Sequence, residues 1–261
     1  FRSLIDLLYD EFEKRKTTIL ESYPKNKTQY LNVLENTTAD GTILLNNIKS
    51  IEDGLTLSLK IYSRSKPLIF LSSYLAGHDP EFHSVRADNI HAGYTAAGYL
   101  FKRGVKKIFF INPGEKNTIF SERYLGCVKA SGDFPSKELS LIDFSALHGA
   151  AGPLHDELKS ALSEKTCGFI CATDGTAFLF DKYLREKGLR NSLEVPLLGI
   201  DGCYKMEEND IRTASVKIDL KSMAANAVEL FYKLLENKVT VTQRILTGCS
   251  ITENDSIVNT N

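Results

Sequence analysis

Polar side chains recur at the points where the predicted β-strands of this chain end. Asp88, Asp143 and Asp201 each follow an apolar stretch, and the pair Thr173-Asp174 ends the run "GFICATD". In an open sheet of parallel strands, the carboxyl ends of the strands form the edge at which ligands bind. Carboxylates, amides and hydroxyls at such an edge would hydrogen-bond a small polar ligand. The full set is Asn46-Asn47, Ser72-Ser73, Asp88-Asn89, Asn112, Asp143, Thr173-Asp174 and Asp201-Gly202.

A structural alternative exists for each of these residues. Ser, Thr, Asn and Asp are also the residues that cap helix N-termini in loops that connect a strand to a helix. Asp174 fits a cap as well as it fits a ligand contact. Asp201 is followed by Gly202 and "CYKMEEND", which favours a loop over a helix start.

The elements that would position these residues alternate along the chain. Apolar, β-rich runs alternate with segments of helical period, which predicts an α/β fold with mostly parallel strands. Several of the expected strands, such as "KKIFFIN", are nearly continuous apolar runs, as in strands buried on both faces. Strands are expected at Thr17–Glu21, Gly41–Asn46, Pro67–Ser72, Ser84–Asp88, Lys107–Asn112, Leu139–Phe144, Gly168–Thr173 and Pro196–Asp201, with late strand structure in "VTQRILTGCSITEN".

Helices are expected between the strands. Gly104 and Gly188 follow two of them, at positions where a left-handed C-cap favours glycine. The expected helices are Ser3–Lys16, Lys25–Asn36, Ile51–Arg64, Asn89–Lys102, Ser121–Ala130, Gly152–Leu162, Gly175–Lys187 and Leu220–Asn237.

Composition restricts the class of protein. The chain has 261 residues, 43% of them hydrophobic and 25% charged, which suits one large globular domain or two small ones. A net charge of -1 gives this segment no whole-chain attraction to nucleic acid. The five cysteines contain no CxxC pair, so we expect reduced thiols packed in the core. No signal peptide is recognised, and no apolar run approaches the roughly 20 residues that span a bilayer.

Six segments together resemble a known family. They are "SVRADNIHAGYTAAGYLFKRGVKKIFFI", "SERYLGCVKA", "LIDFSA", "GFICATDGTAFLFDKYLREKGL", "VPLLGIDG" and "IRTASVKIDLKSMAANAVELFYKLLENK". In order and spacing they resemble the effector-binding domain of LacI/GalR-type bacterial transcriptional regulators, from about Gly41 to Lys238. The resemblance implies the type I periplasmic-binding-protein fold: an α/β protein of two doubly wound parallel-sheet subdomains joined by three crossovers, with the ligand in the cleft between them.

The resemblance also implies how the chain is divided. We expect an N-terminal subdomain of residues 1–113 plus 203–238 and a C-terminal subdomain of residues 114–202 plus 239–261. The family's first strand and its DNA-binding head, a helix-turn-helix with a hinge helix, are expected upstream of Phe1.

Three charged residues match ligand-binding positions of the family. Asp88 stands in the "D-x4-G" pattern, whose aspartate accepts hydrogen bonds from ligand hydroxyls. Arg123 stands in "R-x-x-G" and resembles an arginine whose planar fork grips a diol, carboxylate or phosphate; the alternative is a surface arginine at a helix start. Asp201 resembles the aspartate of the "G-[FY]-D" turn, a direct ligand contact.

Three further candidates match less closely. Phe144 in "IDFSA" resembles an aromatic that stacks on a sugar or base, and packing in the core is the alternative. Thr173 stands where the family usually has Asn. Ser72 stands where an acidic residue or Asn is common, and Val105 replaces the histidine of the family's "GH" motif, so the pattern of hydrogen bonds to the ligand is expected to be unusual.

The expected function is that of the ligand-sensing domain of a cytoplasmic transcriptional repressor. Its effector would be a sugar, with a purine or a sugar phosphate as less common possibilities, and binding would alter operator recognition by a homodimer. The alternative is an exported solute-binding protein of the same fold, against which five unpaired cysteines argue.

An enzyme is not expected, since no P-loop or G-x-S-x-G motif is present. No cofactor is implied. No metal site is expected either, because the five histidines do not lie at metal-ligand spacing; they are His78, His83, His91, His148 and His155.

Overall fold

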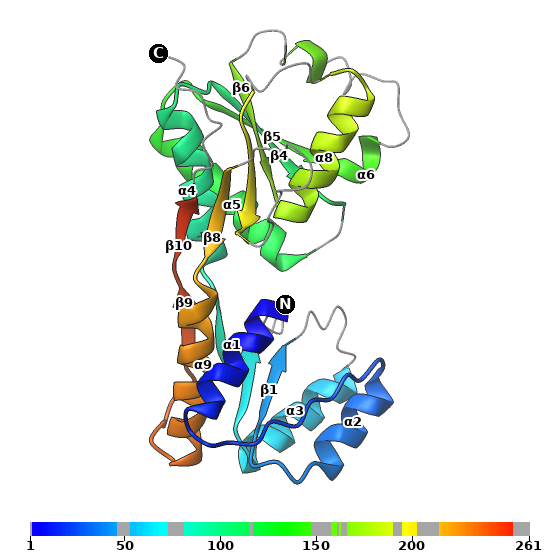
Figure 1. Cartoon of the computed structure of the whole chain (residues 1–261), viewed down its shortest axis with the longest axis vertical. Coiled ribbons are helices and arrows are strands. Elements are labelled where there is room, and N and C mark those ends of the chain that lie inside the picture. The colour runs from blue at the N-terminus through cyan, green and yellow to red at the C-terminus, as the bar shows by residue number, and fades with distance from the viewer. Residues whose placement is uncertain are drawn as a thin grey trace. The chain divides into compact units, whose positions relative to one another are not determined.

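The chain forms two compact α/β units, each with its own sheet (Figure 1). The computed structural model describes residues 2–45, 53–72, 81–114, 117–147, 158–160, 162, 166–189, 195–202 and 214–252. Unit 1 comprises Phe1–Ala87 and Asp219–Thr247, and unit 2 comprises Asp88–Ile218 and Gly248–Asn261. The chain therefore crosses from one unit to the other three times. The α/β fold class and the three crossovers agree with the prediction from the sequence.

Unit 1 is built around a four-stranded parallel sheet in the order β1-β2-β3-β9. All four residues of the "LIFL" strand β2 are buried, because helices lie against both faces of the sheet. Helices α1 and α9 pack side by side (Figure 1), with the rings of Phe12 and Phe231 5.6 Å apart. The elements are α1 Arg2–Glu13, α2 Lys27–Asn36, β1 Thr42–Leu45, α3 Asp53–Ser65, β2 Leu68–Leu71, β3 His83–Ala87, α9 Leu220–Leu235 and β9 Arg244–Thr247.

Unit 2 contains a six-stranded sheet in the order β10-β8-β7-β6-β4-β5. Its strands are parallel except β10, which runs antiparallel to β8. Stacked rings of Phe109 and Phe169 from neighbouring strands lie in the core beneath α8. The elements are α4 Asn89–Lys102, β4 Lys107–Asn112, α5 Thr118–Asp133, β5 Glu138–Asp143, α6 Phe144–Leu147, β6 Cys167–Cys171, α8 Asp174–Glu186, β7 Leu197–Asp201, β8 Ala214–Ile218 and β10 Cys249–Thr252.

Two glycines let α4 and α5 touch backbone to backbone. A Cβ atom on Gly93 of α4 would lie 1.8 Å from the carbonyl oxygen of Arg123, and one on Gly126 of α5 would lie 2.0 Å from that of Ile90. No side chain fits at either point. These are the glycines of the "D-x4-G" and "R-x-x-G" patterns, so each pattern places a glycine at the contact between the two helices.

The predicted elements agree with the structure in most places. The strand Lys107–Asn112 and the helix Asn89–Lys102 have the predicted bounds. The predicted strand Thr17–Glu21 is wrong: it is not assigned as a strand, and none of the described strands pairs with it. Strand β8 was not predicted. Most of the predicted helix Gly152–Leu162 lies outside the described residues.

The boundaries of the two units also differ from those expected. Residues 88–113 belong to unit 2, because α4 packs on α5 and β4 pairs with β5 and β6. Residues 239–247 belong to unit 1, because β9 pairs with β3. The first two crossings come between β3 and α4 and between β8 and α9, at strand-to-helix junctions that look like any other junction of this kind in the sequence.

We predict that Gly126→Ala destabilises the protein by at least about 2 kcal/mol, because the new methyl group must push two helix backbones apart. Gly132→Ala, on the same helix, is the control: a Cβ atom there meets nothing within 4 Å. It should leave stability unchanged or slightly higher, since alanine favours helix. Chemical denaturation of both variants measures the difference, and equal stabilities would contradict the assigned contact.

Candidate functional site

The carboxyl ends of the strands in unit 2 bring several of the predicted residues to one edge of the sheet. Asn112 at the end of β4 is in register with Asp143 at the end of β5. Strand β6, which ends at Cys171, runs beside β4 and leads into Thr173. Asp201 ends β7, the next strand. The edge identified from the sequence therefore exists within this unit.

Arg123 is the centre of a hydrogen-bond network at this edge. Its side chain is buried, with 5% of the residue exposed. The guanidinium donates from Nε to Asn89 Oδ1 at 3.2 Å, from Nη1 to the Ala172 carbonyl oxygen at 2.5 Å, and from Nη2 to Asp201 Oδ1 at 2.8 Å. Arg123 thus joins α5 to α4, to the residue that follows β6, and to β7. The alternative of a surface arginine is wrong.

Asn89 orients the guanidinium from the first turn of α4. It is buried, and while its oxygen accepts from Arg123, its Nδ2 donates to Glu122 Oε2 at 3.0 Å. Both polar ends of the amide are therefore used, which fixes the plane of the side chain. The backbone contact at Gly93 sets how close Asn89 and Arg123 come.

Asp201 lies on a strained turn. Its φ angle is 147°, in a region that non-glycine residues rarely adopt, and Gly202 follows with a φ of 69°. Burial raises the pKa of the Asp201 carboxyl, the Arg123 charge opposes this rise, and the Asp174 charge adds to it. Because the folded state holds this proton more tightly than the unfolded state, ionising Asp201 costs stability, and the cost grows as the pH rises through the raised pKa.

A second carboxylate supports the turn after β7. Asp174 is buried at the start of α8 and accepts a hydrogen bond from Ser215 Oγ at 2.6 Å. The same hydroxyl accepts from the Gly202 backbone N–H at 3.1 Å. Gly199 of β7 makes room for this arrangement, because a Cβ atom there would lie 2.2 Å from Asp174 Oδ1.

Two of the predicted ligand contacts cap helices. Asp88 caps α4, where its Oδ1 accepts from the His91 N–H at 2.9 Å. Thr173 caps α8, where its Oγ1 accepts from the Thr176 N–H at 3.0 Å. These observations support the structural alternative for both residues, and each retains further hydrogen-bonding capacity.

The other two predicted contacts lie elsewhere. Phe144, which is 6% exposed, packs edge-on against the rings of Phe180 and Tyr183. Packing in the core, the alternative to stacking on a ligand, is what this arrangement supports. Ser72 belongs to unit 1, where it follows β2 with a φ of 63° and donates its N–H to the Val85 carbonyl.

Sequence reasoning missed the residues that hold the site together. Asn89 was noted only as a neighbour of Asp88, and Ser215 was hidden because β8 was not predicted. The glycine at Gly199, inside a continuously apolar strand, was the one available signal of a close approach.

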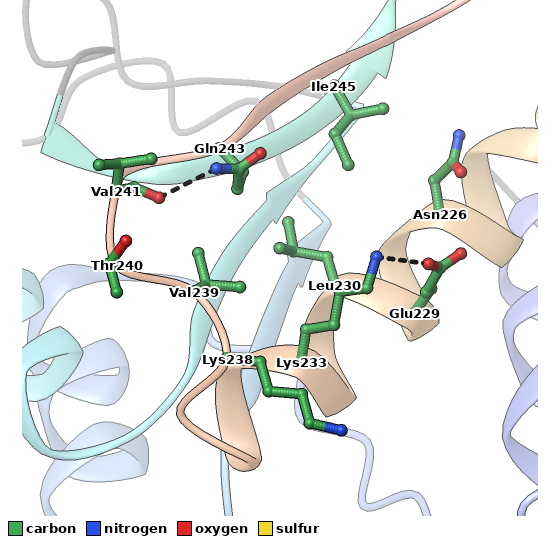
Figure 2. A pocket seen from close by; sticks show the side chains of 10 residues that line it. All are labelled: Asn226, Glu229, Leu230, Lys233, Lys238, Val239, Thr240, Val241, Gln243 and Ile245. Atoms are coloured by element: carbon green, nitrogen blue, oxygen red, sulfur yellow. Dashed lines mark hydrogen bonds and ion pairs between the residues drawn. The ribbon is translucent and has the colours of Figure 1, made fainter.

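A separate groove lies in unit 1 between α9 and the segment that leads into β9 (Figure 2). It has a volume of about 440 Å³ and contains an ion pair between Lys233 and Glu229 at 2.5 Å. None of the predicted ligand-binding residues lines it. The lining residues are Asn226, Glu229, Leu230, Lys233, Lys238, Val239, Thr240, Val241, Gln243 and Ile245.

Among the described residues, no group of three or more His, Cys, Asp and Glu side chains is placed to hold a metal ion. Cys127, Cys167, Cys171 and Cys249 carry thiols, whereas Cys203 lies outside the described ranges. In the part of the chain that the structure covers, no helix is long and apolar enough to cross a membrane.

Two α/β units with parallel sheets and three crossovers define the fold of periplasmic binding proteins and LacI-type regulators. The chain is similar to the sucrose operon repressor of Streptococcus mutans, with 26% identity over 257 residues, covering 94% of this chain and 74% of the repressor. No protein-family model matches the chain.

Solved structures agree with this fold. The cellobiose complex of the transcriptional regulator CelR has a TM-score of 0.76 at 18% identity, covering 97% of this chain and 77% of that one. A LacI family transcriptional regulator from Enterococcus faecium with bound ribose has a TM-score of 0.73 at 19% identity, covering 100% of this chain and 95% of that one. The resemblance to LacI/GalR-type regulators is confirmed.

We predict that Arg123→Ala lowers the free energy of unfolding by about 2–4 kcal/mol, because it leaves Asp201 and Asn89 without their shared partner. Lys182→Ala is the control, since it breaks an exposed ion pair with Glu186 on α8 and should cost less than about 0.5 kcal/mol. Urea denaturation measures both.

A double-mutant cycle that combines Arg123→Ala with Asp201→Ala measures how much the interaction between these two residues contributes to stability. The Arg123 and Asp201 substitutions should be strongly non-additive, because either one alone removes the same ion pair. Simple additivity would show that the contact contributes nothing to stability.

Proposed function

We propose that this chain is the ligand-sensing domain of a LacI/GalR-type transcriptional repressor, and that it binds a sugar at the Arg123–Asp201 edge of unit 2. The observation that carries the proposal is the convergence of Arg123, Asp201 and Asn89 from three elements on the carboxyl edge of a parallel sheet. That edge is where α/β proteins hold small ligands.

The similar proteins support a sugar as the effector. The relative in sequence is named for a sucrose operon, and the two structures described above hold cellobiose and ribose. Their role as regulators supports a cytoplasmic, non-enzymatic function over the alternative of an exported solute-binding protein. Operator DNA is the proposed partner of a separate DNA-binding domain of the same protein.

Asp88, Thr173 and Ser72 are proposed as further ligand contacts. Asp88 has the stronger claim, because it precedes Asn89, which bonds Arg123. Asp88 and Thr173 can cap a helix and accept from a ligand at once, since each oxygen accepts more than one hydrogen bond. Phe144 would reach a ligand only by leaving its contacts with Phe180 and Tyr183.

A panel of sucrose, cellobiose and ribose tests the proposal by thermal shift and calorimetry. A ligand present at about 100 times its Kd should stabilise the folded state by about 2.7 kcal/mol and raise the Tm by several degrees. Asp201→Asn should weaken binding at least about tenfold, because it removes a charged acceptor while its amide oxygen still accepts from Arg123. Lys182→Ala should bind normally. Normal binding by Asp201→Asn would exclude this edge as the site.

We also propose a homodimer, as in the family that the chain resembles. The apolar side of α1 does not supply the dimer contact, because it is buried within unit 1, where Leu4, Leu8 and Phe12 are at most 7% exposed. On α3, Ile61 is 59% exposed, which makes that helix a candidate contact face. Light scattering at tens of micromolar should give twice the monomer mass, and a monomer would contradict the proposal.

A further inference from the structure

We infer that the effector is an uncharged polyhydroxylated molecule, and that the site discriminates against phosphorylated or carboxylated sugars. The inference rests on the proposed function and specifies its ligand. Three independent features of the edge in unit 2 carry it: the balance of charge, the occupancy of the helix N-termini, and the balance of hydrogen-bond donors and acceptors.

The positive charge of Arg123 is already compensated within the protein. Its Nη2 lies 2.8 Å from Asp201 Oδ1, and the guanidinium is buried. A phosphate group would have to compete with Asp201 for this charge, and it would be placed beside a carboxylate. An arginine held in this way can donate hydrogen bonds to a hydroxyl group, but it does not provide an unbalanced charge for an anion.

Carboxylates outnumber basic groups around the pair. Of the described side chains of unit 2 at this edge, four aspartates and Glu122 are acidic, whereas Arg123 and Lys217 are basic. Lys217 is exposed and in register with Asp201. The aspartates are Asp88, Asp143, Asp174 and Asp201. This excess of negative charge would repel an anionic ligand.

Two of the helix N-termini at this edge, those of α4 and α8, already hold carboxylates, whereas that of α5 is capped by the neutral Asn117. An N-terminus binds phosphate through its unpaired N–H groups and the positive end of its dipole. At α4 the Asp88 carboxylate accepts one of these N–H groups. At α8 the Thr173 hydroxyl accepts one, and Asp174 lies in the first turn. An anion at either helix would approach a negative charge of the protein.

Acceptors predominate over available donors. Three of the five N–H groups of Arg123 are used by Asn89, Ala172 and Asp201. Asn112 at the end of β4 has a buried Oδ1 that finds no hydrogen-bond partner among the described residues. Such an edge needs a ligand that supplies donors. Sugar hydroxyls supply them, whereas a phosphate dianion only accepts.

Matched pairs of neutral and phosphorylated sugars test the inference. We would measure calorimetric Kd values for sucrose and sucrose 6-phosphate, fructose and fructose 6-phosphate, and ribose and ribose 5-phosphate. The neutral member of a binding pair should bind about 100-fold more tightly, because like charges brought together are strongly unfavourable. Its affinity should also change little between low and high salt. A phosphorylated member that binds as tightly or more tightly would overturn the inference and leave the proposed function standing.

A variant that lacks one negative charge tests whether electrostatic repulsion causes the preference for the neutral sugar. Asp88→Asn keeps an N-cap residue of equal quality and removes one negative charge. It should reduce the preference for the neutral sugar by about tenfold, a change expected for one nearby charge. Asp133→Asn, at the far end of α5, is the matched control and should leave the preference unchanged. An unchanged preference in Asp88→Asn would overturn the electrostatic explanation. If no sugar of any pair binds, the proposed function itself fails, and the inference fails with it.

Discussion

The close approach of α4 and α5 is the constraint on which the candidate site depends. The Arg123 carbonyl occupies the space where a side chain on Gly93 would begin, so the arginine is fixed by the packing of its own backbone. Cys127, one helical turn further along α5, donates its thiol hydrogen to the Gly93 carbonyl at 3.3 Å and is fully buried. A site residue that starts from such a dense contact has little freedom to move.

Arg123 consequently has a structural role whether or not it also contacts a ligand. Its partners come from three different elements, and each hydrogen bond restricts the guanidinium in a different direction. The bond to Asp201 also compensates its charge before any ligand arrives. Preorganisation of this kind lowers the entropic cost of binding, because the donor groups are already oriented. Under the proposed function, Arg123 therefore contributes both to the stability of the fold and to ligand recognition.

Local signals in the sequence were sufficient for much of the fold. The apolar run 108–111 favours a buried strand, and the helix 89–102 is marked by Asp88 at one end and Gly104, with a φ of 87°, at the other. Residues 17–21 have the composition of a strand, but a strand also needs a partner.

The network around Arg123 was less accessible to such reasoning. Arg123 could be recognised as a candidate from the "R-x-x-G" pattern. Its burial could not be predicted, because its partners lie 34, 49 and 78 residues away in the chain. Ser215 and Asp174, which support the turn at Gly202, are likewise 41 residues apart. Only the packed sheet brings such residues together.

The three crossings affect the order in which a ribosome can complete the two units. When synthesis reaches Ile218, every parallel strand of unit 2 has been made, whereas unit 1 still lacks α9 and β9. The apolar stripe of α1 therefore remains uncovered through the synthesis of residues 88–218, until α9, the helix that packs against it, has been made. Two elements of unit 1 are therefore still to be made when the parallel strands of unit 2 are complete, and the early helices of unit 1 are the part of the nascent protein that most needs protection from aggregation.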